Sequence, residues 1–430
     1  MFFFNVEGTL PMRMPKIVLA ALAAASLALA ACAPQDVTQT PADNKPASSQ
    51  PATTTETTPA EGESTPAEPA DTTPVKVGII YSKTGPLAAY GETFYQGFLA
   101  GLDYATDGTN AVNGRPLEIT YTDDAGNPDK AVSAAKEAIA NGTKIIGGTV
   151  VSGVALTLAE QAAQNQVLYI SGPAATDGLQ GINKYTFRSG RQSLQDVAAG
   201  AAFVDSGQKV LVFAQDNAFG QGNVAAVKAV FGAKGVEVSE LLVPEEATDF
   251  IPFARQIIEA KPDAVFVAWA GATSGAMWQG LTQQGVFDST KVITGLGDIS
   301  TYNAFGEASA NISFLNHYFA GAADNDVNKA LIERLDAGGH AADLFSPDGF
   351  VAAQMVVRAV EAGGDDVDAM IAGLEGWEFE GPKGKQTIRA SDHVMVQPMF
   401  HAKLVQDGSE WKPELVDTVS AEDAAPAEAP

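Results

Sequence analysis

Short apolar runs alternate with helical periods along most of the chain. Eight of these runs are strand candidates: 75–81, 116–124, 143–148, 167–171, 209–215, 236–243, 263–270 and 291–295. Most are apolar almost throughout, which suits parallel strands covered by helices on both faces. Residues 75–419 are too many for one core of usual size, so the pattern predicts an α/β protein with two doubly wound parallel-sheet lobes.

The segments between the strand candidates have helical periodicity. It predicts helices near 90–104, 223–235 and 250–260, and another from about 274. Asn127 and Pro128 form a start signal for another helix, because Asn caps and Pro suits the first turn.

Ligands of doubly wound sheets bind beyond the carboxyl ends of the strands, so the loops after the strands are the candidate site. Six such loops are rich in Gly and small hydroxyl residues: 82–92, 147–156, 171–179, 215–223, 268–276 and 295–301. Together they carry isolated aromatic residues and a few acids, of which Asp298 is the candidate for the site. This composition can hold a small zwitterion.

The beginning of the chain predicts export. Arg13 and Lys16 precede an Ala- and Leu-rich run at 17–31, which is the charge-then-apolar order of a signal peptide and is short for a bilayer span. Leu29-Ala30-Ala31-Cys32 resembles the lipobox of bacterial lipoproteins, and Cys32 is the only cysteine. We therefore expect a lipoprotein signal peptide at 1–31, a lipid on Cys32 and attachment to the outer side of a cell membrane. Met12 and Met14 are alternative starts.

Two segments have the composition of disordered chain. Residues 32–74 are rich in Thr, Pro, Ala and acids and carry no aromatic residue, so we expect an acidic tether. Residues 420–430 are a second low-complexity piece, expected to carry no structure. The formal net charge of −26 argues against binding nucleic acid, because such a chain repels phosphate backbones.

Several stretches, in order, resemble a type I periplasmic binding protein of the leucine/isoleucine/valine-binding branch. They are VKVGIIYSKTGPLAAYGE, DDAGNPDKAV, SGPAAT, KYTFRSG, NAFGQG and IRASDHVMVQPMF, and the resemblance covers residues 75–404. It implies two lobes joined by a hinge of three crossovers, which we place near Ser193, Gly321 and Gly376. The first lobe would be 75–192 plus 322–376, and the second 193–321 plus 377–419.

The resemblance also implies roles for polar residues. Ser152, Ala174 and Thr176 are expected to meet the carboxylate of an amino acid, and Asp298 its ammonium group. A carboxylate opposite an ammonium group is worth more in a closed cleft than in water. The alternatives are local: Ser152 as a helix cap, and Asp298 as a loop residue capping the next helix.

Three aromatic residues are expected to form the apolar wall of the same site. Tyr90 matches an aromatic residue at the rim in the family, Phe219 stands where the family often has Tyr, and Trp269 ends a strand candidate. Simple packing on the first helix is the alternative for Tyr90, and a core position is the alternative for Trp269.

The resemblance implies an ABC importer: the closed protein would deliver a branched-chain or other apolar amino acid to a permease with its ATPase subunits. We expect a monomer with no cofactor or metal. A hydrolase is the enzyme alternative, but the sequence has no G-x-S-x-G or H-E-x-x-H motif and no P-loop. A tethered ligand sensor, or a binder of amides, urea or aromatic acids, would use the same cleft.

Overall fold

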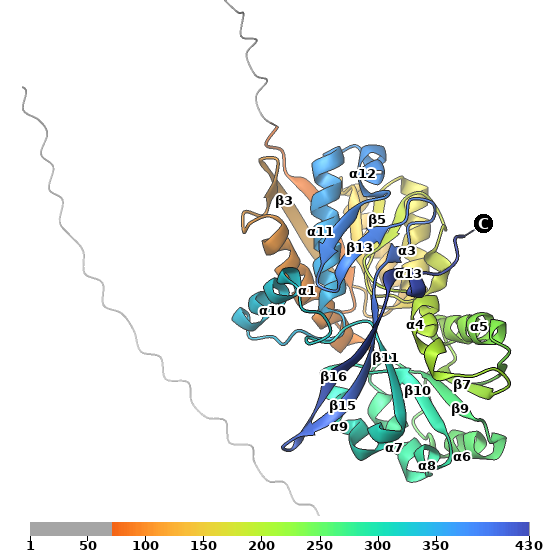
Figure 1. The fold of residues 1–430 in the computed structure, drawn as a ribbon. Coiled ribbons are helices and arrows are strands. Elements are labelled where there is room, and N and C mark those ends of the chain that lie inside the picture. The colour runs from red at the N-terminus through yellow and green to blue at the C-terminus, as the bar shows by residue number, and fades with distance from the viewer. Residues whose placement is uncertain (1–70, 430) are drawn as a thin grey trace, which may run out of the picture. The chain divides into compact units, whose positions relative to one another are not determined.

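The computed structural model describes residues 71–429, which form two α/β lobes joined by three crossings of the chain (Figure 1). The expected signal peptide, Cys32 and the tether up to residue 70 lie outside the described residues. Within 71–429, no helix combines the length and the hydropathy that crossing a membrane would need.

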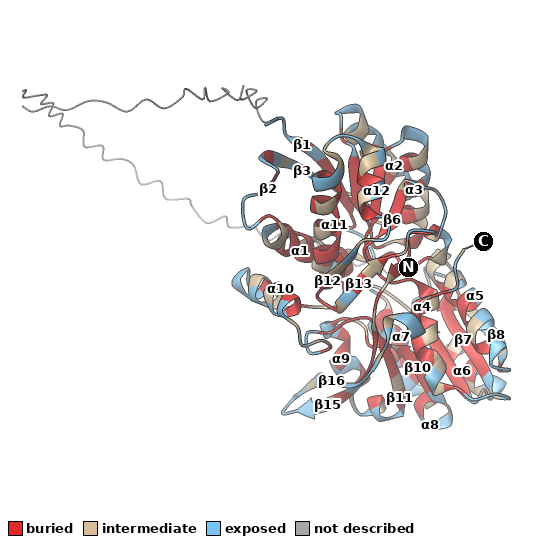
Figure 2. Cartoon of the chain, turned by 45° about the horizontal axis from the view of Figure 1, so that its top comes forward, coloured by how far each residue is buried: buried red, intermediate tan, exposed pale blue. Residues whose placement is uncertain are grey.

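The first lobe is built on a six-stranded sheet with the order β2-β3-β1-β4-β5-β6. Its strands are β1 (Val75–Tyr81), β2 (Ala111–Val112), β3 (Arg115–Asp123), β4 (Ile145–Gly148), β5 (Leu168–Ser171) and β6 (Thr186–Arg188). All neighbours are parallel except β2, which pairs antiparallel with β3. Every residue of β4 and β5 is buried, as expected for strands covered on both faces (Figure 2). The sheet therefore confirms the predicted parallel lobe and adds β6.

Helices cover both faces of this sheet. They are α1 (Ala88–Ala105), α2 (Pro128–Ala140), α3 (Ser152–Asn165), α11 (Ser346–Gly363) and α12 (Val367–Leu374), with the short η1 (Asp177–Leu179). Helix α10 (Asp326–Ala337) packs outside them, mainly on α1. As predicted, Asn127 caps α2, accepting a hydrogen bond from the Lys130 amide at 3.1 Å. Helices α1 and α11 pack so closely at Gly97 that a Cβ there would lie 2.0 Å from the Ser346 carbonyl oxygen. Glycine at this position allows the two backbones to touch.

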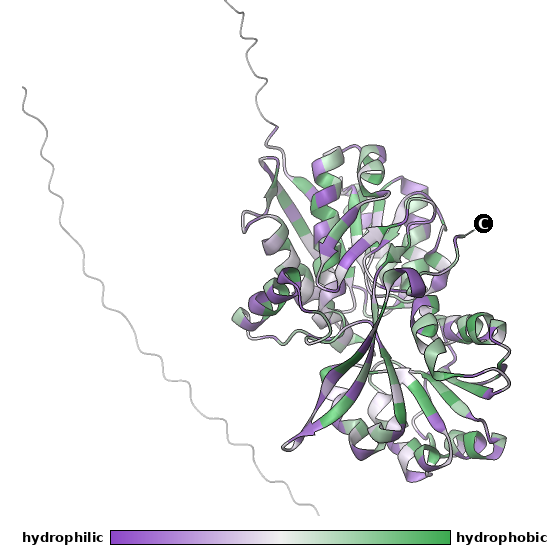
Figure 3. Ribbon diagram, in the orientation of Figure 1, coloured by the Kyte–Doolittle hydropathy of each residue, from purple (hydrophilic) through white to green (hydrophobic). Residues whose placement is uncertain are grey.

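The second lobe has a seven-stranded sheet with the order β16-β15-β11-β10-β9-β7-β8. Its strands are β7 (Lys209–Gln215), β8 (Glu237–Val243), β9 (Ala264–Ala268), β10 (Lys291–Gly295), β11 (Ile312–Asn316), β15 (Met399–Asp407) and β16 (Glu410–Val419). Strands β7 to β11 are parallel, and the antiparallel hairpin β15–β16 extends the edge beside β11. The central strands are hydrophobic, whereas β16 is mostly exposed and carries many polar residues (Figure 3).

Shorter helices surround the second sheet. They are α4 (Ser193–Gly200), η2 (Ala201–Phe203), α5 (Ala218–Ala233), α6 (Ile251–Ala260), α7 (Ser274–Gln283), α8 (Val286–Ser289), α9 (Ile299–Phe305) and η3 (Gly306–Asn311). Helix α5 begins five residues before the predicted start at Asn223, because the Asn217 side chain accepts from the Gly220 amide and caps the helix there.

The chain crosses between the lobes at 189–192, at 317–325 and at 397–398. The first two crossings lie where the sequence predicted them, near Ser193 and Gly321. The third was expected near Gly376 and lies about twenty residues later. After Gly376 the chain forms a small sheet of β12 (Glu378–Gly381), β13 (Gly384–Ile388) and β14 (Met395–Val396). Ile388 and Met395 are buried in the core of the first lobe, so 377–396 packs with that lobe.

The end of the chain is ordered up to residue 429, which corrects the expectation of a structureless tail. Residues Ala421–Ala424 form the short helix α13, and Ala424 is fully buried in a core cluster of the second lobe. Arg389 Nη1 donates to the Pro426 carbonyl at 2.8 Å, and Gln180 Nε2 donates to that of Ala427 at 2.7 Å. Composition alone missed this because single small residues, rather than a hydrophobic pattern, make the contacts.

Ending the chain after Ser420 should lower the melting temperature by roughly 2–5 °C, since it removes two buried residues, Ala424 and Pro426, and several hydrogen bonds. Differential scanning calorimetry of the full chain and the truncated chain measures this. Glu422→Gln, at an exposed position of the same helix, is the matched control and should leave the melting temperature unchanged. Equal melting temperatures for the full and truncated chains would show that the tail contacts contribute nothing.

Candidate functional site

A cavity of about 530 Å³ lies between the two lobes. Its walls come from the carboxyl ends of the strands and the loops that follow them, including those after β1, β4 and β5 and those after β7, β9 and β10. This is the place where open parallel sheets bind ligands. The volume is within the usual range of small-molecule sites, roughly 300–1,000 Å³.

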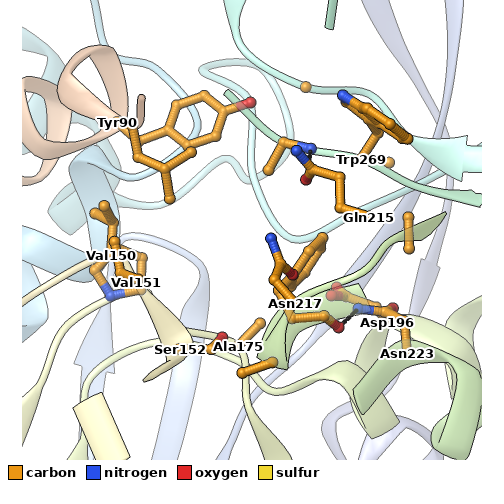
Figure 4. Close-up of a pocket in the computed structure, with 18 of the residues that line it drawn as sticks. Tyr90, Val150, Val151, Ser152, Ala175, Asp196, Gln215, Asn217, Asn223 and Trp269 are labelled. Carbon is orange, nitrogen blue, oxygen red and sulfur yellow. Dashed lines mark hydrogen bonds between the residues drawn. The ribbon is translucent and has the colours of Figure 1, made fainter. Parts of the chain in front are cut away.

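Four of the seven predicted ligand-binding residues line this cavity: Tyr90, Ser152, Phe219 and Trp269. In Figure 4, Tyr90 and Trp269 approach the cavity from one side, and Ser152 and Ala175 from the opposite side. The loops after β1, β4, β7 and β9 therefore converge as the sequence predicted.

Ser152 is the first residue of α3 rather than its cap. The cap position is held by Val151, whose side chain makes no capping hydrogen bond. The backbone N–H groups of the first turn therefore lack a side-chain acceptor, and a helix start of this kind attracts an anion. With the Ser152 hydroxyl beside it, the start of α3 is suited to a carboxylate.

Aromatic side chains form much of the remaining wall. Tyr90 is 7% exposed and meets Phe345 edge to face, with ring centroids 5.0 Å apart. Burial, and secondarily Asp298, raise the pKa of Tyr90, so it stays protonated. Trp269 stacks on Phe213 at 5.4 Å and donates from Nε1 to Thr273 Oγ1 at 3.0 Å. These contacts fix the rings and leave their cavity faces apolar.

Ala174, Thr176 and Asp298 do not line the cavity. Ala174 is fully buried, and its carbonyl, like that of Thr176, accepts from Arg188 Nη2. Thr176 Oγ1 accepts from the Gly178 amide at 3.2 Å. Both residues thus hold the loop, and their neighbour Ala175 reaches the cavity instead.

Asp298 is displaced by the turn that precedes it. Gly297 lines the cavity with a φ of +77°, and the chain then enters α9. The Asp298 carboxylate accepts a hydrogen bond from the Ser300 hydroxyl and is 8% exposed. The local alternative, a loop acid capping the following helix, is right only about position: Asp298 holds the N-cap position of α9, but its side chain makes no capping hydrogen bond.

An ion pair that the sequence did not predict, between Arg191 and Asp196, lies in the cavity wall. Arg191 Nε lies 3.2 Å from the Asp196 carboxylate, and Nη1 donates to the Pro173 carbonyl at 3.0 Å. Both side chains are more than nine-tenths buried. Arg191 follows β6, a strand of three residues that is too short to be recognised from its pattern, so the loop after it was not expected at the site.

Glu245 is the other acid at the cavity, and it follows β8. It is exposed, and its Oε1 accepts from Asn217 Nδ2 at 3.2 Å. In the described part of the chain no Lys or Arg forms an ion pair with it. The loop after β8 was not expected at the site either, although its two adjacent acids, Glu245 and Glu246, are visible in the sequence.

His317 lines the cavity beside the second crossing and is neutral. Burial, and secondarily Arg191 and Lys383, hold the pKa of His317 well below its usual range. Its Nε2 lies 2.8 Å from the Leu344 carbonyl, so Nε2 carries the proton. The charged side chains of the lining are thus Arg191, Asp196 and Glu245, with a net negative sign.

Hydrogen bonds join the lobes at the rim of the cavity. The Ala272 amide of the second lobe donates to the Pro86 carbonyl of the first at 3.0 Å. Asp343, which precedes α11, accepts from the Ile299 amide at the start of α9 at 3.1 Å. These contacts hold the lobes together over the cavity.

Asp343 should make stability depend on pH. Burial raises its pKa to about 6, above the 3.8 of an ordinary Asp carboxyl. The folded state then binds the proton more tightly, so this contribution to stability is complete below about pH 4 and is lost as the pH rises through about 6. Asp343→Asn stays neutral at every pH, so we expect its melting temperature, relative to wild type, to rise between pH 4 and pH 7.5.

Differential scanning fluorimetry at the two pH values measures this. The matched control is Asp336→Asn, at an exposed position of α10, whose difference from wild type should not change with pH. A constant difference for Asp343→Asn would contradict the assignment.

The fold and the cavity together define a two-lobed solute-binding protein. Sequence comparison matches residues 74–409 to the family described as "Periplasmic binding protein". The chain belongs to this family, as a type I periplasmic binding protein of the branched-chain amino acid ABC importer group. The family comprises substrate-binding components of transporters, which act outside the cytoplasm, and is not a family of enzymes.

Two curated relatives illustrate the similarity. "Leu/Ile/Val-binding protein homolog 3" of Brucella melitensis is 27% identical over 307 residues, covering 69% of this chain and 82% of the relative. "Leu/Ile/Val-binding protein BraC3" of Rhizobium johnstonii is 27% identical over 322 residues, covering 73% and 87%.

Solved structures agree on the fold. An "ABC-type branched-chain amino acid transporter" from Rhodopseudomonas palustris is 31% identical, with a TM-score of 0.69, covering 81% of this chain and 97% of its own. A solute-binding protein from Rhodopseudomonas palustris BisB5, in complex with 3,4-dihydroxy benzoic acid, is 26% identical, with a TM-score of 0.72, covering 81% and 98%. The names of similar proteins therefore include two ligand classes.

Proposed function

We propose that this chain captures a small amino acid, including the branched-chain and other apolar ones, and delivers it to the permease of an ABC importer. One observation carries the proposal: the same cavity holds the start of α3, which suits a carboxylate, and Glu245, which suits an ammonium group. Among the described residues, no Lys or Arg forms an ion pair with Glu245. The names of the Leu/Ile/Val-binding relatives support the same class.

The carboxylate of the ligand would meet the first lobe. Ser152 and the free backbone N–H groups of the first turn of α3 provide donors there, and the adjoining Ala175 is small enough to let a ligand approach. Charge-assisted hydrogen bonds of this kind are shorter and stronger than neutral ones.

The ammonium group would meet Glu245 on the second lobe. Glu245 replaces Asp298 in this role, because Glu245 lines the cavity and Asp298 does not. Asn217 Nδ2 holds one carboxylate oxygen at 3.2 Å, and the other carboxylate oxygen is left for the ligand. Headgroup contacts on both lobes would favour the closed arrangement over an open one, since only the closed state makes both.

Aromatic carboxylates are the second candidate class, because Tyr90, Phe219 and Trp269 would suit a ring and one similar protein binds such an acid. The net negative sign of the charged lining argues against a simple anion. It suits a zwitterion, whose positive end gains from Glu245.

A thermal-shift panel separates the two classes. Leucine, isoleucine and valine at about a hundred times the dissociation constant should add about 2.7 kcal/mol of stability, with no comparable effect of benzoate. Glu245→Gln should weaken amino-acid binding about 10- to 100-fold, because it removes the negative charge opposite the ammonium group and leaves only a neutral acceptor.

The controls for Glu245→Gln are Glu246→Gln, at the exposed neighbouring position, and Asp298→Asn; neither should change the affinity. A shift with benzoate and none with any amino acid would reject the proposed ligand class. Loss of binding in Asp298→Asn but not in Glu245→Gln would restore the role first expected for Asp298.

We also propose that a lipid on Cys32 anchors the protein to the outer side of the membrane. The lipobox-like sequence before Cys32 supports this. Cys32→Ser should abolish labelling by radioactive palmitate and move the protein from the detergent phase to the aqueous phase in a Triton X-114 partition. Ser26→Ala, within the same apolar run, is the control and should be labelled like wild type. Labelling that persists in Cys32→Ser would contradict the anchor.

An importer and a tethered sensor would use the same closing cleft. The family membership favours the importer.

A further inference from the structure

One part of the cavity wall is polar and deeply buried, and the proposed headgroup contacts do not use it. We call it the polar floor, and it consists of Arg191, Asp196, Gln215, Asn223 and His317. Each of these residues is between 2% and 8% exposed. Asp196, Gln215 and Asn223 lie on the same side of the cavity (Figure 4). Arg191 lies in the first crossing, and His317 is the first residue of the second.

Two donor atoms of the polar floor are left over by the hydrogen bonding of the described residues. Arg191 uses Nε for Asp196 and Nη1 for Pro173, which leaves Nη2. Gln215 Oε1 accepts from the Ala270 amide at 3.0 Å, so its amide orientation is fixed and Nε2 is left. Both nitrogen atoms can donate to a ligand.

Acceptor atoms are left over beside them. Asn223 Nδ2 donates to Ser193 Oγ and to the Phe219 carbonyl, which fixes its amide and leaves Oδ1 without a donor among the described residues. His317 is protonated on Nε2, so Nδ1 is an acceptor. The Asp196 carboxylate accepts only from Arg191 Nε within residues 71–429.

A purely aliphatic side chain would desolvate these atoms without replacing their hydrogen bonds. Each buried donor or acceptor left unsatisfied is unfavourable, and a site built to hydrogen-bond a ligand rejects an analogue that lacks the polar group. The ligand group at the polar floor must therefore carry both an acceptor and a donor.

Charge narrows the choice further. A carboxylate at the polar floor would face Asp196, and an ammonium group would face Arg191. Because the two form one buried pair, the polar floor suits a neutral group. A carboxamide fits both requirements, with its carbonyl toward Arg191 and Gln215 and its N–H groups toward Asp196 and Asn223.

We propose that the polar floor is a specificity subsite for a carboxamide, so that among amino acids the protein prefers those with an amide side chain over aliphatic ones of the same shape. This inference rests on the proposed function, since the headgroup contacts are shared. The subsite predicts a ligand with a polar group at the end of its side chain, while the CH₂ groups of that side chain pack against Tyr90, Phe219 and Trp269.

Isosteric pairs of amino acids test the subsite. Asparagine and leucine have the same branching, as do glutamine and homoleucine, and only the first of each pair carries an amide. Isothermal titration calorimetry on the purified full-length chain should show at least one amide binding about tenfold or more tighter than its aliphatic partner. Glutamate should bind more weakly than glutamine.

The double variant Arg191→Met with Asp196→Leu removes both charges of the polar floor without leaving one unpaired. It should abolish the amide preference while leucine still binds. Arg334→Met with Asp103→Leu is the matched control, because it removes an Arg–Asp pair at 2.8 Å outside the cavity, and it should keep the preference. Gln215→Met removes Nε2 and keeps the length of the side chain, so it should reduce the ratio of affinities between the amide and its aliphatic partner. This variant provides the test if the double variant does not fold.

The outcomes are distinct. Leucine binding as tightly as asparagine, and homoleucine as tightly as glutamine, would overturn the subsite and leave the amino-acid function standing. An amide preference that survives in both floor variants would also overturn it. If no amino acid binds and benzoate does, the proposed function fails and the subsite fails with it.

Discussion

Two buried arginines in and beside the first crossing hold the cavity together. Arg188 is 2% exposed, and its Nη2 donates to the carbonyls of Ala174 and Thr176, while Nη1 donates to Gln192 Oε1 at 2.8 Å. Burial lowers the pKa of Arg188 to about 10, so it remains charged at neutral pH and needs these acceptors. Arg191 donates in the same way to Pro173. The loop after β5 and the first crossing are therefore one rigid unit, which positions the wall of the cavity.

A second buried pair lies within the first lobe, beside the second crossing. Lys383, in the turn between β12 and β13, lies 3.2 Å from Asp348 of α11, and both side chains are fully buried. Asp348 Oδ2 is 3.9 Å from His317 at the second crossing. Breaking a buried pair leaves an uncompensated charge, so the turn between β12 and β13 is held firmly on α11.

The strand order explains why a site could be located from sequence and why its residues could not all be named. Parallel strands of one sheet end at one edge, so the loops of Tyr90 and Ser152 meet in the first lobe and those of Phe219 and Trp269 in the second. The way the two lobes face each other brings both sets to one cavity. The exact position along each loop depends on backbone turns. The turn at Gly297 directs Asp298 away from the cavity. Two further loops reach the cavity that the pattern did not indicate: β6 is too short to be recognised as a strand, and the loop after β8 is not rich in glycine.

The sequence by itself determined the two α/β lobes, the starts of α2 and α6 and the edge at which a ligand binds, because periodicity, caps and the direction of parallel strands are local properties. Only the tertiary structure decided that 377–396 packs with the first lobe, that the chain end is ordered and that Arg191 and Asp196 face the cavity. All three depend on contacts between segments far apart in sequence. Whether a charge or a methyl group is buried there is decided by the distant segment that packs on it, and not by the residues next to it in the chain.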